Sequence, residues 1–113
     1  MDGFLPNGPV LRTPEPGFDP QNLDIRGWLN GELRQDSNTS DMIFSIPQLI
    51  SYISTYMTLE PGDLIITGTP AGVILGTKHK HWMKPGDEYT VEITGLHRLS
   101  NRLVSAGSGP SRH

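Results

Sequence analysis

The clearest periodic pattern in the sequence lies between residues 45 and 57. Apolar side chains recur there at helical spacing, and polar ones occupy the opposite face: Ile46, Leu49, Ile50, Ile53 and Met57 form the apolar stripe. Ser45 and Gln48 fit a capping box at the start, and Pro47 lies in the first turn, where its missing N–H costs nothing. The pattern predicts one helix, Ser45–Met57, with a stripe that another element must cover.

A β-hairpin is predicted upstream of this helix. Residues Leu23–Leu29 alternate roughly between apolar and polar, Asn30 and Gly31 follow directly, and Glu32–Gln35 continue in an extended pattern. Asn and Gly both tolerate the positive φ that a type I′ turn demands at its two central positions. We therefore expect Asn30 and Gly31 to close the hairpin.

Two Pro-Gly-Asp turns each precede an apolar run that is typical of a strand. The turn at residues 61–63 precedes Leu64–Gly68, and the turn at residues 85–87 precedes Tyr89–Gly95. The Pro-rich start of the chain predicts loop, with one short strand at Val10–Thr13. The expected fold class is mixed α/β, mainly β, with one clear helix.

Composition limits the chain to one small domain and excludes several functions. Its 113 residues contain 13 Gly and 10 Pro, which favour turns and short strands. The net charge of −3 comes from interspersed charges and predicts no nucleic-acid or membrane partner. Cysteine is absent, which excludes disulfides and thiol chemistry. Residues 106–113 are small and polar, as expected of a flexible tail.

Three stretches in this order and spacing resemble the fumarylacetoacetate hydrolase family. They are Asn30-Gly31-Glu32 with Gln35, Ser37, Asn38 and Thr39 leading to Met42-Ile43-Phe44; Pro61-Gly62-Asp63 with Thr67-Gly68-Thr69-Pro70-Ala71-Gly72-Val73; and Gly95 through Val104. The opening residues 1–9 also look like a family segment that ends in Gly-Pro. Each stretch alone is weak, but together they are specific.

The resemblance implies a fold and a cofactor. Family members have a rolled, barrel-like, largely β core and are usually dimers, so a homodimer is expected. They bind a divalent metal, Mg²⁺ or Mn²⁺ with Ca²⁺ as an alternative, through a Glu-x-Glu motif and a later Asp that precede the segment resembling residues 1–4. We therefore expect residues 1–105 to be the C-terminal part of such a catalytic domain, without its metal ligands.

The loop Thr67–Gly72 is the first candidate site. It follows a buried-looking strand, and its N–H groups and hydroxyls could stabilise an anionic substrate or an enolate oxygen. Residue types alone favour a structural turn. The resemblance reverses this preference: it implies that Thr69 contacts the substrate carboxylate or carbonyl as the catalytic residue, with Thr67, Gly68 and Pro70 also binding substrate.

The hairpin tip is a second candidate, because a polar tip can reach over a neighbouring pocket. Backbone geometry alone explains Asn30 and Gly31, so the turn interpretation is favoured there. In family enzymes this hairpin lies close to the site, and the resemblance makes Gln35 a further substrate contact.

Other polar residues are weaker candidates. His79 and His81 could share one side of a strand, but the adjacent lysines would oppose a cation, so a solvated loop is favoured. Asp63 and Asp87 each follow Pro-Gly, where Asp caps its own backbone, and Glu60 has no partner at ligand spacing. His97 stands where the family usually has glycine, and a surface role is expected.

For the intact enzyme the resemblance implies metal-dependent C–C hydrolysis, decarboxylation or isomerisation of a 1,3-dicarbonyl or 2-oxo acid, a small carboxylate substrate. The alternative is a non-catalytic fragment or interaction module that is inactive alone. An unrelated β-rich interaction domain is a third possibility, opposed by the long match at residues 67–73. The compartment is expected to be the cytoplasm, with mitochondria as the alternative, because no targeting segment is evident.

Overall fold

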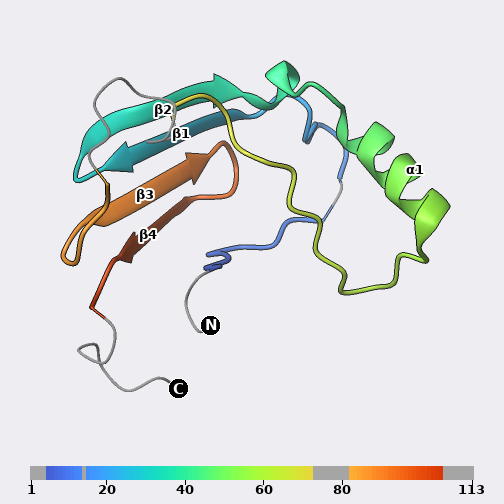
Figure 1. Cartoon of the computed structure of the whole chain (residues 1–113). Coiled ribbons are helices and arrows are strands. Elements are labelled where there is room, and N and C mark those ends of the chain that lie inside the picture. The colour runs from blue at the N-terminus through green and yellow to red at the C-terminus, as the bar shows by residue number, and fades with distance from the viewer. Residues whose placement is uncertain (1–4, 14, 73–81, 106–113) are drawn as a thin grey trace.

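A four-stranded antiparallel sheet dominates the protein (Figure 1). The computed structural model describes residues 5–13, 15–72 and 82–105. The strand order is β2-β1-β3-β4, with η1 and α1 between the second and third strands along the chain. The elements are β1 (Asp24–Leu29), β2 (Glu32–Asn38), the 3₁₀ turn η1 (Thr39–Asp41), α1 (Ile46–Tyr56), β3 (Glu88–Ile93) and β4 (Arg98–Arg102). The predicted mixed, mainly β class is confirmed.

The hairpin of β1 and β2 forms as predicted. Asn30 and Gly31 both have positive φ, at 50° and 83°, as a type I′ turn requires. The second strand continues past the predicted Gln35 to Asn38, where the Asn38 side chain accepts from the Ser40 N–H and starts η1. Side-chain capping of this kind stops the ladder and turns the chain toward α1.

Helix α1 also begins as predicted. Ser45 is its N-cap, its hydroxyl accepts from the Gln48 N–H, and the Gln48 side chain accepts from the Ser45 N–H in return. The apolar stripe is only half covered, however, because α1 contains no buried residue. Of the predicted stripe, Ile50 is 43% exposed and Met57 61% exposed. The helix lies beyond one end of the sheet rather than across its face (Figure 1).

Two predicted strands are wrong. Leu64–Gly68 and Val10–Thr13 are irregular in the structure. A strand needs a neighbour for its N–H and C=O groups, and no described segment forms a ladder with either stretch. Leu64 and Ile66 are accordingly 62% and 69% exposed. After α1 the chain therefore returns toward β2 as an irregular segment (Figure 1).

The predicted strand at Tyr89–Gly95 corresponds to β3, which pairs with β1 on one side and with β4 on the other. Gly95 itself lies in the turn after β3 and has a φ of 81°. The pattern gave no prediction of β4, whose alternation is weak and whose residues are mostly exposed.

The hydrophobic core of the described chain is small. Leu23 and Leu29, each 8% exposed, are its buried apolar residues, and Thr39 is buried beside Leu23. The Thr39 hydroxyl accepts from the Leu23 N–H at 2.8 Å, and the Thr39 N–H donates to the Leu23 carbonyl. Within the described residues, no helix is long and apolar enough to cross a membrane.

Candidate functional site

The candidate loop Thr67–Gly72 is held against β2 by the side chain of Gln35. Its Nε2 donates to Thr69 Oγ1 at 2.8 Å and to the Pro70 carbonyl at 2.9 Å. A Cβ placed on Gly72 would lie under 3.0 Å from the carbonyl oxygen of Arg34. Glycine is therefore required where the loop meets the strand, and the structure brings the predicted residues Gln35, Thr69 and Pro70 together.

The direction of these hydrogen bonds is fixed by chemistry. A backbone carbonyl can only accept, so the atom of Gln35 that faces the Pro70 oxygen must be the amide nitrogen. That nitrogen uses one hydrogen for Pro70 and the other for Thr69. The Thr69 oxygen is thereby an acceptor from Gln35, and its own hydrogen has no acceptor among the described residues. Thr69 is exposed, so this hydrogen is available to a ligand.

Tyr89 of β3 contacts the oxygen of the Gln35 amide, whose nitrogen contacts the loop. Its hydroxyl donates to Gln35 Oε1 at 2.8 Å, and Gln35 is 9% exposed. Burial raises the pKa of Tyr89 from its ordinary value, while the positive charge of Arg34 acts in the opposite direction. Tyr89 therefore remains a protonated donor at neutral pH.

The meeting of Tyr89 and Gln35 depends on a glycine between them. Gly27 of β1 pairs with Gln35 on one side and with Val91 on the other. A Cβ on Gly27 would lie under 3.0 Å from Tyr89 Oη and 3.2 Å from Gln35 Oε1. Because Gly27 has no side chain, Tyr89 Oη and Gln35 Oε1 can approach each other over β1.

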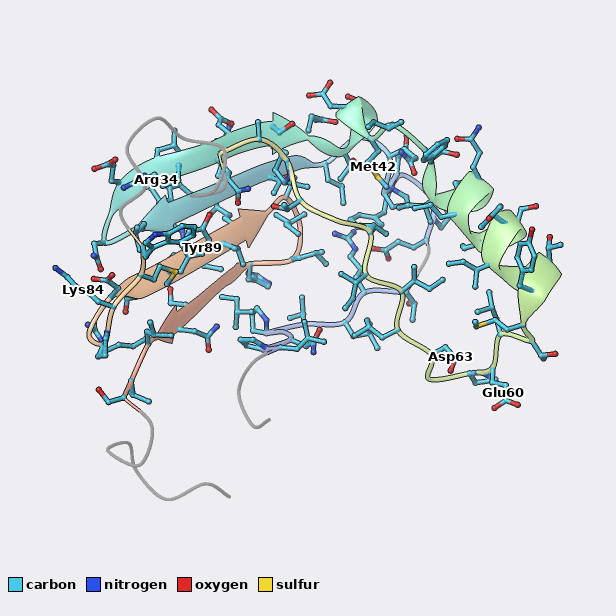
Figure 2. The ribbon with its side chains drawn as sticks, in the orientation of Figure 1. Arg34, Met42, Glu60, Asp63, Lys84 and Tyr89 are labelled. Carbon is cyan, nitrogen blue, oxygen red and sulfur yellow. The ribbon has the colours of Figure 1, made fainter. Side chains whose placement is uncertain are left out.

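A β-bulge next to this point shapes the strand under the loop. Gly27 pairs with Gln35, but its neighbour Trp28 pairs with Leu33, which leaves Arg34 as an extra residue in β2. The Arg34 side chain is 23% exposed and forms an ion pair with Glu32 at 3.1 Å. Arg34 and Tyr89 lie over the same half of the sheet (Figure 2).

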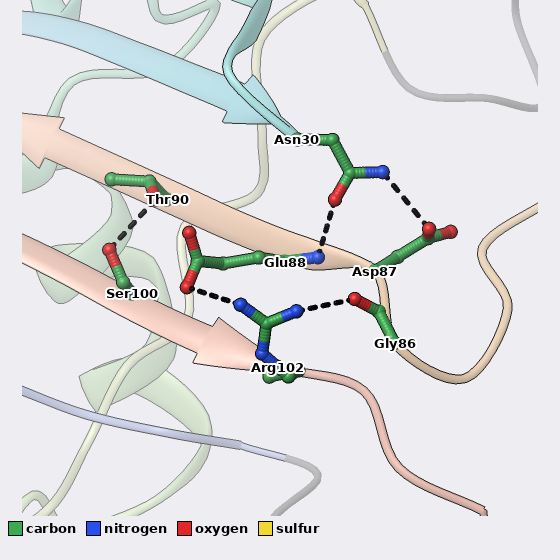
Figure 3. A network of polar contacts seen from close by, with 7 residues as sticks. All are labelled: Asn30, Gly86, Asp87, Glu88, Thr90, Ser100 and Arg102. Carbon is green, nitrogen blue, oxygen red and sulfur yellow. Dashed lines mark hydrogen bonds and ion pairs between the residues drawn. The ribbon is translucent and has the colours of Figure 1, made fainter.

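Asn30, at the hairpin tip, has a structural role. The Asn30 side chain donates to Asp87 Oδ1 at 2.9 Å and accepts from the Glu88 N–H at 2.8 Å (Figure 3). Arg102 of β4 holds the same turn, since it donates to the Gly86 carbonyl at 2.7 Å and contacts Glu88 at 3.3 Å. The turn interpretation of Asn30 is confirmed, with the addition that its amide joins the hairpin to β3.

The tip does border a hollow. A cavity of about 460 Å³ is lined by Asn30, Glu32, Arg34, Trp82 and Lys84, together with Leu29 and Asp87. Its charged groups are of both signs, and Asp87 and Arg34 are already engaged in contacts within the chain. It therefore has the character of a polar groove beside the turn.

Both Pro-Gly-Asp turns close in the same way. Asp63 accepts from the Glu60 N–H at 2.8 Å, and Asp87 accepts from the Lys84 N–H at 2.9 Å. In return, the N–H of each Asp donates to the carbonyl of the same partner at 3.0 Å. The prediction that Asp caps its own turn is confirmed at both positions. The Asn30 amide, with the Lys84 N–H, lowers the pKa of Asp87 below its usual value.

The described residues do not fit a metal ion. No group of three or more His, Asp or Glu side chains is arranged to hold one in this part of the chain. Glu60 and Asp63 lie beyond the C-terminal end of α1, far from Arg34 and Tyr89 (Figure 2). His79 and His81 fall outside the described residues.

His97 is exposed and has a φ of 64°, a left-handed conformation. Glycine adopts this conformation without strain, which gives a physical reason for the glycine that the family resemblance led us to expect there.

Two parts of the network were missed by sequence reasoning. Gly27 interrupts a strand pattern, and an isolated glycine inside a strand indicates close approach by another group, so this signal was available. Tyr89 had no such signal, because an aromatic residue in a strand is ordinary.

The sequence is similar to one known family of enzymes. The family described as fumarylacetoacetate (FAA) hydrolase C-terminal matches residues 1–104. The 4-hydroxyphenylacetate degradation bifunctional isomerase/decarboxylase of Salmonella dublin is 50% identical over 91% of this chain and 22% of its own length. A mitochondrial oxaloacetate tautomerase of Bos taurus is 46% identical over 92% of this chain and 33% of its own.

Solved structures of related proteins superpose on this chain. A fumarylacetoacetate hydrolase from Exiguobacterium antarcticum superposes with a TM-score of 0.88 at 42% identity, covering 93% of this chain and 38% of that one. A Sphingobium maleylpyruvate hydrolase in complex with manganese(II) and pyruvate has a TM-score of 0.67 at 38% identity, covering 76% of this chain and 30% of that one. The chain thus spans between about a fifth and two fifths of the relatives it matches.

Proposed function

The chain belongs to the fumarylacetoacetate hydrolase family, and from this membership we propose that it supplies one wall of a metal-dependent active site. The reaction is hydrolysis, decarboxylation or isomerisation of a small 2-oxo acid or 1,3-dicarbonyl compound. All three reactions develop negative charge on an enolate oxygen. The wall is the loop at residues 67–70, with Thr69 as the residue that contacts the substrate.

One observation supports this assignment above the others. The Thr69 oxygen accepts from the buried Gln35 amide, and no described residue accepts its own hydrogen. A hydroxyl held in this way is a preorganised donor, which stabilises developing negative charge without reorganisation. Thr67 and Gly68 are exposed beside it and line the same wall.

The metal belongs to another part of the enzyme in this proposal. The described carboxylates Asp63 and Asp87 are committed to their own turns, and no described cluster fits a cation. In the intact enzyme the metal would act as a Lewis acid toward substrate oxygens.

The small core supports a role as part of a larger assembly. Leu23 and Leu29 are the buried apolar residues of the described chain, while Ile43 is 90% exposed and Phe44 60% exposed. A stable domain would cover such surface with another element. This observation favours a chain that is inactive alone, whether its cover comes from the same polypeptide or from a second copy.

The test compares the 113-residue chain with an extended protein, in which the region that precedes the match in the relatives is joined to Met1. Each is titrated calorimetrically with Mn²⁺ or Mg²⁺ and then with pyruvate. We expect binding by the extended protein alone. Absence of pyruvate binding by the metal-loaded extended protein would contradict the proposed function. Equal metal binding by the short chain would place the ligands within it, and residues 79–81 would be tested first.

A further inference from the structure

We propose that Gln35 and Tyr89 are positioning residues that set which way the Thr69 hydroxyl points. This inference rests on the proposed function, because it assigns these residues to the same site. It differs from the expectation that Gln35 touches substrate: both hydrogens and the oxygen of its amide are used within the chain.

The Pro70 carbonyl fixes the orientation of the Gln35 amide. The Pro70 carbonyl can only accept, so it selects the nitrogen end of the Gln35 amide. The oxygen end must then face Tyr89, whose hydroxyl donates to it at 2.8 Å. One carbonyl therefore determines the orientation of an amide that could otherwise be turned over.

The orientation of the Gln35 amide determines the role of the Thr69 hydroxyl. A hydroxyl beside an amide nitrogen must accept from it, which leaves its hydrogen for another partner. If the amide were reversed, Thr69 would donate to the amide oxygen and would lose its capacity to donate to a substrate. The polarity of the network thus decides whether Thr69 can stabilise negative charge.

The Gln35 amide is held on all sides by its hydrogen bonds. Gln35 is 9% exposed. Its side chain lies over Gly27 and contacts both Tyr89 and the loop Thr67–Gly72. Tyr89 is 54 residues away from Gln35 in sequence, and Thr69 is 34 residues away. Three segments that are distant along the chain are therefore joined by one amide. An amide with every hydrogen-bonding group engaged holds its rotamer, and preorganisation of the site follows from this.

The test uses Gln35→Glu and Tyr89→Phe in the extended protein, with Thr90→Val as the matched control. Thr90 is the neighbour of Tyr89 in β3, and its hydroxyl contacts Ser100 at 2.7 Å, away from the loop. Two readouts are taken: NMR order parameters of the Gly68, Thr69 and Ala71 amides, and kcat/KM on oxaloacetate as a function of pH.

A carboxylate at position 35 can accept from Tyr89 but cannot donate to Thr69 or Pro70. We expect Gln35→Glu to lower the loop order parameters below about 0.6 and to lower kcat/KM by about 10²-fold at neutral pH. Protonation of the new carboxyl supplies one donor, so activity should recover as the pH falls, opposite to an unspecific loss of structure. Tyr89→Phe should reduce kcat/KM by about tenfold, and Thr90→Val should change neither readout.

The two proposals can fail separately. If the wild-type extended protein does not turn over, the proposed function fails, while the loop order parameters still judge the positioning role. If Gln35→Glu and Tyr89→Phe both leave the loop as ordered as in the wild type, the inference is wrong, whatever the activity.

Discussion

Asn30 and Asp87 are 57 residues apart in sequence, and their side chains meet with Asn30 Nδ2 2.9 Å from Asp87 Oδ1. The contact joins the tip of the β1–β2 hairpin to the turn that begins β3 (Figure 3). The same asparagine has a positive φ and accepts from the Glu88 N–H. One residue therefore both closes the hairpin and binds the start of β3.

Replacement of Asn30 by glycine should therefore destabilise the protein even though glycine suits the turn. Asn30→Gly keeps the positive φ but removes the side-chain contacts to Asp87 and to the Glu88 N–H. We expect the melting temperature of the extended protein to fall by about 2–4 °C. Gly31→Asn, which changes the other turn position without touching Asp87, is the control. An unchanged melting temperature in Asn30→Gly would show that the amide contacts do not matter.

The same contact predicts an acid-dependent loss of stability. The Asn30 amide and the Lys84 N–H lower the folded-state pKa of Asp87 below its ordinary value of 3.8. The stabilisation is complete above that pH and is lost as the pH falls through the lower folded value. The free energy of unfolding, measured with urea from neutral pH to strong acid, should fall as the pH falls. Asp87→Asn should reduce this pH dependence. Asp63→Asn, in the matching turn without an asparagine partner, is the control variant.

Gly27 should tolerate no side chain while Tyr89 keeps its hydroxyl. A Cβ at Gly27 would lie under 3.0 Å from Tyr89 Oη, so Gly27→Ala is expected to lower the free energy of unfolding by about 1–3 kcal/mol. Tyr89→Phe removes the nearest atom, and the double variant should lose less than the sum of the single variants. Strict additivity in urea unfolding would contradict the packing described for these two residues.

Tyr89 also predicts behaviour at high pH. Burial raises its folded-state pKa above 10.0, so its contribution is present below that pH and is lost as the pH rises toward the folded value. The unfolding free energy should fall in this alkaline range, and the Tyr89→Phe variant should lack that part of the fall. Equal alkaline slopes in the two proteins would show that the hydroxyl is not buried.

Gly72 and Gly62 separate two costs of adding a methyl group. Both have a left-handed backbone, with φ of 107° and 93°, but a Cβ meets nothing at Gly62 and the Arg34 carbonyl at Gly72. Gly62→Ala should cost about 1–2 kcal/mol from backbone strain alone. Gly72→Ala should cost about 1–3 kcal/mol more, because a backbone carbonyl cannot move aside easily. Equal costs in chemical unfolding would mean that the loop is not seated on β2.

Local patterns predicted the local structure well. The hairpin turn follows from the positive φ that Asn30 and Gly31 tolerate, and the start of α1 follows from Ser45 and Gln48, so each depends on neighbours in sequence. The strand expected at Leu64–Gly68 did not form, because an apolar run specifies a strand only when another segment supplies its hydrogen bonds. That partner is a property of the whole assembly.

Long-range contacts of the site escaped prediction for a similar reason. Resemblance to the family selected Thr69 and Gln35, and the structure places Gln35 Nε2 2.8 Å from Thr69 Oγ1. Nothing local indicated that Tyr89 would reach Gln35 across β1, since this requires the absence of a side chain at Gly27. The polarity of the amide follows only once the Pro70 carbonyl is seen beside it.

The central claim is that the Thr69 hydroxyl donates to substrate, and steady-state kinetics of Thr69→Val against Thr69→Ser in the extended protein test it most directly. Valine keeps the shape without the hydroxyl, whereas serine keeps the hydroxyl. We predict that kcat/KM on oxaloacetate falls by about 10²–10³-fold in Thr69→Val and is largely retained in Thr69→Ser. A Thr69→Val enzyme within about twofold of the wild type would contradict the account.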